Sequence, residues 1–292
     1  MKIGSAPAIQ GVRGVSTSQS MDFAINHMSA PQLLLPEFFA LARQLGALRV
    51  EIRNDIAGNA ILDGTPAKEV KALAKANDVT IISINALQKF NLWSDTRPAE
   101  TEALADYAAA AGARALVLVA ANDGAIADAA LRVGNANRLL TLIAPILRER
   151  GLVGLVECPG FETCSLRSKR EAVQAIDNAN GRDVFRLTHD TFHHHLAGEP
   201  DLFPELTGLI HISGVDDPAI TVHDMRDSHR LLVGPKDRLG NLEQIAALRA
   251  GGYTGPLSFE PFAEELRHLA DPAAAISQSM DFIVSGLKEK AA

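Results

Sequence analysis

What the sequence lacks excludes several classes of protein. No apolar run approaches the roughly 20 residues that a membrane-spanning helix needs, so we expect no membrane partner. Lysine and arginine form no cluster and the formal net charge is −7 at pH 7. This argues against a nucleic acid partner, because binding one requires many neutralised phosphates. The only two cysteines, Cys158 and Cys164, flank one loop and suggest no disulfide framework, so a reducing cytoplasm fits best.

Two further absences concern domain organisation. No Gly-x-Gly-x-x-Gly motif follows the first apolar segment, so the sequence does not support a nucleotide-binding open sheet, and we expect no nucleotide cofactor. Residues 1–20 lack the continuous apolar segment of a secretory signal and are rich in Gly, Ser, Ala and Gln. We expect them to be a flexible leader. Residues 21–292 have a length that suits one α/β barrel domain.

Short apolar segments alternate with helix-like stretches along the rest of the chain. The helix-like stretches have apolar residues at helical spacing, and Gly46, Gly112 and Gly151 stand where helix C-terminal caps belong. Four such stretches cover residues 36–46, 66–78, 97–112 and 135–151. Strands are predicted near residues 22–26, 48–52, 78–84, 114–119, 152–157, 184–189, 208–212 and 256–260.

This alternation predicts the fold class. A strand followed by a helix, repeated eight times without a long linker, is the pattern of a single parallel (β/α)₈ barrel, the TIM barrel. The alternative is a doubly wound open sheet, which shows the same alternation locally. The count of eight units favours the barrel.

Four predicted strands end in side chains that can bind a metal ion. An uncompensated carboxylate at the end of an apolar strand is costly, so several that converge imply a cation or a hydrogen-bond network. In a barrel these strand ends meet at the rim where active sites form. Three carboxylates and one imidazole suit a single divalent ion, with Mn²⁺ ranked first and Co²⁺, Mg²⁺ or Zn²⁺ as alternatives. The four residues are Glu157, Asp190, His211 and Glu260.

The simpler interpretation is that each of these residues is an ordinary strand-end polar group or a helix cap. Four of them in consecutive strand-end positions favour the metal site. The segment DTFHHHL at 190–196 adds three histidines, but successive residues point in different directions and cannot all reach one ion. His193 can aim at the same pocket, whereas we interpret His194 and His195 as solvent-facing or packing residues. The long polar segment 213–240 is a candidate for substrate contact or a lid.

These motifs resemble those of the xylose-isomerase-like TIM-barrel superfamily, which includes sugar isomerases and ketose 3-epimerases. The resemblance covers essentially everything after residue 21 and rests on ECPGFE at 157–162, DTFH at 190–193, His211 and GGYTGPLSFEPF at 251–262. Within the superfamily the chain is most similar to the inosose isomerases, in the segments INHMSAP, VEIRND, GFETCSLRSK and HISGVDDP.

The resemblance implies roles for single residues. Glu157 and Glu260 would act as acid and base as well as metal ligands, beside Asp190 and His211 as the other two ligands. An ion held there would stabilise, as a Lewis acid, the charge of an enediolate.

Substrate contacts are implied at His193, Glu162 and Arg230. Arg226 is a rival to Arg230, because the sequence LLVGPKDRLG that follows Arg230 is longer than the Pro-Gly-x-Gly stretch of the family. Two residues at the ends of the first two strands are further candidates for contacts with substrate hydroxyls, namely His27 and Arg53.

The activity implied is conversion of 2-keto-myo-inositol to 1-keto-D-chiro-inositol by proton transfer, in inositol catabolism. A ketose 3-epimerase of open-chain sugars and an inosose dehydratase are the alternatives, although Pro159 and Gly160 replace a pair that the epimerases usually have there. A nuclease of the same fold and a non-catalytic sugar-binding barrel are less favoured. The expected partner is a small polyol or keto-sugar, and the chain can form a homo-oligomer.

Overall fold

A computed structural model describes residues 21–56, 61, 63–126 and 128–291. The leader that we expected at residues 1–20 lies outside this range. In the described part of the chain, none of the helices combines the length and the apolar character that crossing a bilayer requires.

Eight parallel strands form a closed barrel in chain order, and β1 pairs with both β2 and β8. The predicted (β/α)₈ barrel is therefore confirmed, and the open sheet is wrong. The strands are β1 (Phe23–Asn26), β2 (Arg49–Arg53), β3 (Thr80–Gln88), β4 (Ala115–Val119), β5 (Val153–Glu157), β6 (Phe185–Asp190), β7 (Thr207–Ile212) and β8 (Leu257–Phe259).

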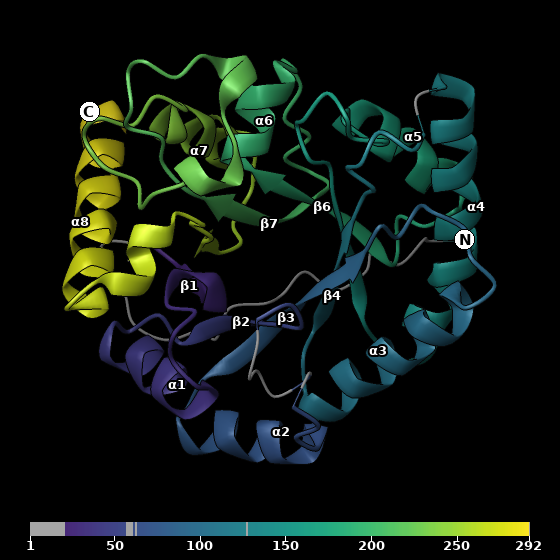
Figure 1. Cartoon of the computed structure of the whole chain (residues 1–292), viewed down its shortest axis with the longest axis horizontal. Helices are drawn as coiled ribbons and strands as arrows, with labels where there is room; N and C mark the ends of the chain where they lie inside the picture. The colour runs from purple at the N-terminus through teal and green to yellow at the C-terminus, as the bar shows by residue number, and fades with distance from the viewer. Residues whose placement is uncertain (1–20, 57–60, 62, 127, 292) are drawn as a thin grey trace.

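Helices surround the strands as an outer ring (Figure 1). Each follows one strand, as the right-handed β-α-β connection requires. They are α1 (Leu35–Gln44), α2 (Ala67–Ala76), α3 (Arg97–Ala111), α4 (Ala129–Glu149), α5 (Lys169–Asn178), α6 (Thr191–Ala197), α7 (Asn241–Ala250) and α8 (Pro272–Ala291).

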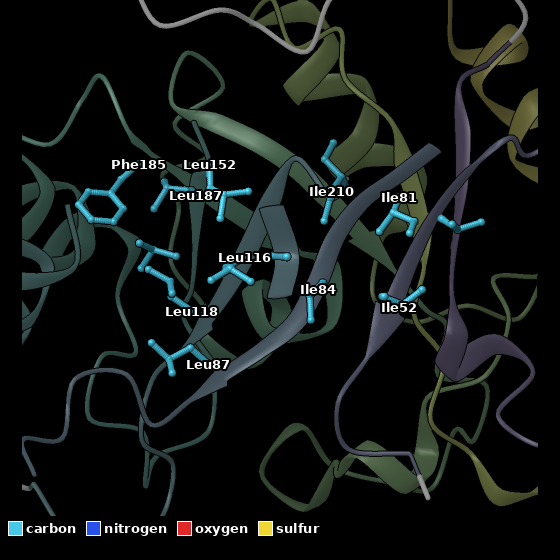
Figure 2. Packing of buried hydrophobic residues seen from close by; sticks show 14 of the residues in the cluster. Ile52, Ile81, Ile84, Leu87, Leu116, Leu118, Leu152, Phe185, Leu187 and Ile210 are labelled. Carbon is cyan, nitrogen blue, oxygen red and sulfur yellow. The ribbon is translucent and has the colours of Figure 1, made fainter. Parts of the chain in front are cut away.

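The strands divide their residues between two layers, because successive side chains of a strand point to opposite faces. On β4, Leu116 and Leu118 belong to the large cluster between strands and helices, which Figure 2 shows from close by. Ala115 and Val117 belong instead to a smaller cluster inside the barrel, together with Leu155 of β5. The same alternation on the later strands decides which polar side chains face the interior.

The predicted boundaries differ from the structure where the apolar pattern is weak. The helix α4 begins at Ala129, six residues before the predicted start, because its first turn lies at the surface, where Leu131 is 60% exposed. The Asp128 side chain caps it by accepting a hydrogen bond from the Leu131 amide. At the C-terminal ends, Gly112 adopts φ +79° as the cap of α3, as the sequence predicts.

Candidate metal centre

Successive side chains of a strand point to opposite faces, and this alternation brings the four predicted ligands together inside the barrel mouth. On β5, Glu157 lies two residues after Leu155, which faces the barrel interior, and on β7 His211 lies two residues after Leu209, which does the same. Asp190 is the last residue of β6, and Glu260 follows β8 directly. One ligand atom from each of the four residues lies within 4.8 Å of the others, and all four residues are buried.

The donor atoms of this quartet could hold a metal ion. His211 Nδ1 lies 3.1 Å from Glu260 Oε2 and 3.6 Å from Glu157 Oε1. It is nevertheless a buried nitrogen for which the described residues offer no well-formed hydrogen bond. A buried imidazole nitrogen directed at two carboxylates, with a third nearby, is a donor set that a divalent ion of borderline hardness satisfies. The residues present therefore fit a divalent metal.

Burial and mutual contact shift the protonation of the ligands in opposite directions. Burial alone would lower the pKa of His211, but the carboxylates of Glu260 and Glu51 outweigh it and hold that pKa well above its usual value. Burial raises the pKa of Glu157. The contact with His211 lowers this pKa, and the negative charge of Glu260 raises it, so the pKa lies above its ordinary value. For Glu260 the effect of burial is overcome by His211, Arg230 and Arg53, so its pKa lies well below the ordinary value.

Asp190 has two separate tasks. Its Oδ1 accepts hydrogen bonds from the backbone amides of Phe192, at 2.8 Å, and His193, at 3.1 Å, and so caps α6. Its Oδ2 accepts a hydrogen bond of 2.6 Å from Arg230 Nη2. The cap fixes the carboxylate in place, because rotation of the side chain would break both amide contacts.

Of the two rival arginines, the structure brings Arg230 to the quartet. Arg230 is 1% exposed, and its Nη2 also lies 3.1 Å from Glu260 Oε2. Its guanidinium stacks over the Phe262 ring at 4.6 Å. Arg226 is at the surface, where its Nη1 donates to the backbone carbonyls of His223 and Met225.

Two other predicted substrate-binding residues, Arg53 and His193, lie next to members of the quartet. Arg53 is buried and donates from Nη1 to Glu260 Oε1 at 2.7 Å, while Asp55 holds the rest of its guanidinium. His193 is buried next to Asp190, with its ring edge-on to Phe161 at 5.3 Å.

His27 and Glu162 have contacts away from the four ligands. His27 Nε2 lies 2.8 Å from the Leu33 carbonyl and the ring stacks on Phe38. Burial lowers the pKa of His27 to about 4, so the imidazole is neutral. Glu162 is 69% exposed, 3.6 Å from His223 Nδ1.

A cavity of about 670 Å³ lies between the loop after β5 and the segment 222–228, and none of the four ligands lines it. Phe161 and Asp227 line it and connect it with the centre, because Phe161 contacts His193 and Asp227 accepts a hydrogen bond from Arg230 Nη1 at 3.2 Å. Glu162 also lines this cavity. The segment predicted to contact substrate or form a lid therefore supplies one wall and, through Arg230, part of the metal centre.

Gly160 sets how closely the loop after β5 approaches α6. A Cβ added at Gly160 would lie 2.1 Å from the backbone oxygen of His193 and 2.7 Å from Leu196 Cβ. We expect Gly160→Ala to lower the free energy of unfolding by about 3 kcal/mol, because the clash is with backbone and the helix must shift. Gly134→Ala is the matched control, since nothing lies near its added Cβ on α4 and helix propensity favours alanine. Denaturant unfolding of both variants tests this, and equal stabilities would contradict it.

Two buried polar groups of this region have no signal in the sequence pattern. The first is Glu51 of β2, which lies 3.0 Å from His211 Nε2 and is completely buried. The second is Lys169, at the start of α5, which is 4% exposed. Its Nζ lies 3.0 Å from His189 Nδ1 and 2.9 Å from His194 Nδ1. His189 points outward from the barrel because its neighbour Asp190 points inward, so this cluster lies outside the metal centre.

The Lys169 cluster makes stability depend on pH. Burial lowers the pKa of Lys169 to about 8 from 10.5, so above pH 8 the folded protein loses a proton that the unfolded chain keeps. The unfolded state then binds more protons, and stability rises with pH. We expect a contribution of about 1.4 kcal/mol between pH 7 and pH 9. The free energy of unfolding of the wild-type protein and of Lys169→Met, measured at pH 7 and pH 9, tests this contribution. It should rise more with pH in the wild-type protein, and an equal change in both proteins would contradict the prediction.

Comparison with known proteins agrees with this architecture. Residues 39–285 match the family described as xylose isomerase-like TIM barrel, so the chain belongs to that family. No curated protein sequence matches the chain significantly. Among solved structures, a xylose isomerase domain-containing protein from Salmonella typhimurium LT2 is 33% identical, with a TM-score of 0.82, over 94% of this chain and 100% of that one.

Two more distant structures show the same fold. The IolI protein, solved with a bound zinc atom, is 19% identical with a TM-score of 0.80, over 92% of this chain and 99% of its own. An L-ribulose 3-epimerase is 18% identical with a TM-score of 0.69, over 92% of this chain and 95% of its own. The fold is thus that of sugar isomerases and epimerases.

Proposed function

We propose that this protein is a metal-dependent isomerase that moves a proton between neighbouring carbons of an inosose. The observation that carries the proposal is the convergence of Glu157, Asp190, His211 and Glu260 within 4.8 Å at the barrel mouth. These four residues would hold one divalent ion, with Mn²⁺ as our first choice and Zn²⁺ also supported by the zinc in IolI. When bound, this ion would act as a Lewis acid toward the substrate oxygens.

Two carboxylates of the quartet can transfer the proton. Glu157 comes from β5 and Glu260 from the end of β8, so they reach the site from non-adjacent strands. One removes the proton from the carbon beside the carbonyl, and the other returns a proton at the former carbonyl carbon. The hydroxyl proton moves from one oxygen to the other, so ketone and hydroxyl exchange places without a redox cofactor. Both groups are buried, so bulk water does not compete with the two carboxylates during the transfer, and each carboxylate can exchange its proton with solvent between turnovers.

The buried guanidinium groups position one of these carboxylates, Glu260. Arg53 and Arg230 bind different oxygens of Glu260, Oε1 and Oε2. Asn26 Nδ2 also donates to Oε1, at 3.2 Å. Since both oxygens are held, Glu260 keeps one orientation, as a positioned base requires. Arg230 and His193 each contact a residue of the cavity wall, Asp227 and Phe161 respectively, and we propose that they contact substrate hydroxyls, as would Glu162 on that wall.

The inosose is preferred as substrate because the segments that carry the closest likeness also build this site. INHMSAP contains Asn26, VEIRND contains Glu51 and Arg53, and HISGVDDP begins with His211. We place the reaction in inositol catabolism, in the cytoplasm. A ketose 3-epimerase, which would use the same glutamates on an open-chain sugar, is the second candidate and is favoured by the fold shared with an L-ribulose 3-epimerase.

Removal and return of the metal test the proposal. The protein should lose its conversion of 2-keto-myo-inositol to 1-keto-D-chiro-inositol in excess chelator and regain it with Mn²⁺ or Co²⁺. Product analysis distinguishes the alternatives, because an epimerase converts open-chain ketoses and a dehydratase releases water and forms an absorbing enone. Full activity in excess chelator would refute the metal-dependent reaction.

A further inference from the structure

Glu51 is a carboxylate in the interior of the barrel that the acid and base roles leave unexplained. It is the third residue of β2, two before Arg53, and its side chain is 0% exposed. A buried carboxylate is costly unless hydrogen bonds compensate it, so its retention in the barrel interior calls for a reason.

Four side chains from four other positions contact Glu51. Asn85 Nδ2 donates to Oε2 at 2.7 Å, and the hydroxyls of Ser83 and Ser258 donate to Oε2 and Oε1, each at 2.5 Å. The fourth contact is His211 Nε2, which lies 3.0 Å from Oε1 and 3.2 Å from Oε2. The donors on β3 and β8 leave the carboxylate no freedom to turn away from His211.

This contact decides which nitrogen of His211 faces the carboxylates of the quartet. An imidazole that donates its Nε2 proton to an acceptor presents Nδ1 as the free electron pair in its neutral form. In this protein Nδ1 is the nitrogen that lies 3.1 Å from Glu260 Oε2 and 3.6 Å from Glu157 Oε1. His211 therefore links Glu51, at its Nε2, to the carboxylates of the quartet, at its Nδ1.

We propose that Glu51 is a positioning residue of the metal centre, which holds His211 in the tautomer and orientation that let Nδ1 bind the ion. The inference rests on the proposed metal site and adds a residue to it. Carboxylate partners of ligating histidines fix the ring and raise its basicity, and their loss typically costs 10–100-fold in metal affinity or activity. We therefore expect Glu51 to act on metal affinity without touching the substrate.

Glu51→Gln is the most informative substitution. The amide oxygen is best placed at the Oε2 position, because Asn85 donates there and an NH₂ group would oppose it. The NH₂ group then takes the Oε1 position, where the Ser258 hydroxyl can rotate to accept from it, and it points a donor at His211 Nε2. His211 would respond by carrying its proton on Nδ1, which blocks the ligand atom.

The experiment is a competition titration of metal-free protein with Zn²⁺ against a chelator of known affinity. The wild-type protein should bind one ion, and Glu51→Gln should bind it about 10–100-fold more weakly. Ser83→Ala is the matched control, because it removes one hydrogen bond from Glu51 Oε2 and leaves the His211 contact in place. Its affinity should fall by less than that of Glu51→Gln, since the charge and the His211 acceptor remain.

A second variant and a second readout separate positioning from stability. Glu51→Asp keeps the negative charge, but its side chain is one methylene shorter and places the carboxylate farther from His211. This variant should therefore also weaken Zn²⁺ binding. In the Zn²⁺-loaded wild-type protein, long-range ¹H–¹⁵N NMR should show a protonated Nε2 on His211, a signal that Glu51→Gln should shift or lose. Wild-type affinity in both Glu51 variants would overturn the inference, while absence of Zn²⁺ binding to the wild-type protein would overturn the metal centre itself.

Discussion

Replacing Glu157 by glutamine is expected to lower kcat for inosose isomerisation by about 10²–10⁴-fold, the range that a positioned general acid or base contributes. Glutamine has nearly the same shape and still offers an oxygen, but it cannot accept and return a proton at pH 7. Glu157 is 5% exposed, so bulk water does not replace it as a proton donor. Steady-state kinetics at saturating Mn²⁺, with metal content measured on the same sample, is the required measurement.

The comparison for this prediction is Glu162→Gln. Glu162 lines the cavity and is 69% exposed, so its loss should raise KM and leave kcat within a few fold. If Glu157→Gln retains metal and kcat stays within about tenfold of wild type, Glu157 is not the proton-transfer group.

Arg230→Met should lower the stability of the metal-free protein by about 3–5 kcal/mol, the usual cost of removing one partner of a buried ion pair. Arg230 is 1% exposed, and its Nη2 serves both Asp190 and Glu260. Without this guanidinium two carboxylates remain buried with less compensation. A fall of roughly 5–15 °C in the thermal midpoint, recorded in chelator, is the expected readout.

Arg226→Met is the control for this effect, because Arg226 is four residues away in the same segment but lies at the surface and binds only backbone carbonyls. Its midpoint should change by at most about 2 °C, as surface substitutions rarely exceed 0.5 kcal/mol. Equal shifts in the two variants would mean that Arg230 does not balance the buried acids.

The fold could be predicted because its signals are local and repeated. Eight apolar segments alternate with amphipathic stretches, and the closed barrel follows from their number. The four candidate ligands could be identified for the same reason, since each stands at or near a strand end, and those ends meet at one rim. The choice between Arg226 and Arg230 needed the structure, because both lie in a segment without regular periodicity.

Two buried polar residues could not be found from the pattern. Glu51 lies within β2 between Val50 and Ile52, and its importance depends on contacts with β3, β7 and β8, which come later in the sequence. Lys169 opens a helix and looks like an ordinary surface lysine, yet its amine reaches His189 and His194. Long-range polar contacts of this kind leave no periodic signal, since one side chain meets partners from separate strands and helices.

The central claim is that the quartet supports proton transfer on an inosose, and the most direct measurement is NMR of 2-keto-myo-inositol incubated in D₂O with Mn²⁺-supplemented protein, after removal of the paramagnetic ion. We expect deuterium at the carbon beside the carbonyl together with the signals of a second inosose, and neither in a matched sample of Glu157→Gln. An inosose that remains unlabelled and unchanged with the metal-loaded wild-type protein would contradict the proposed function.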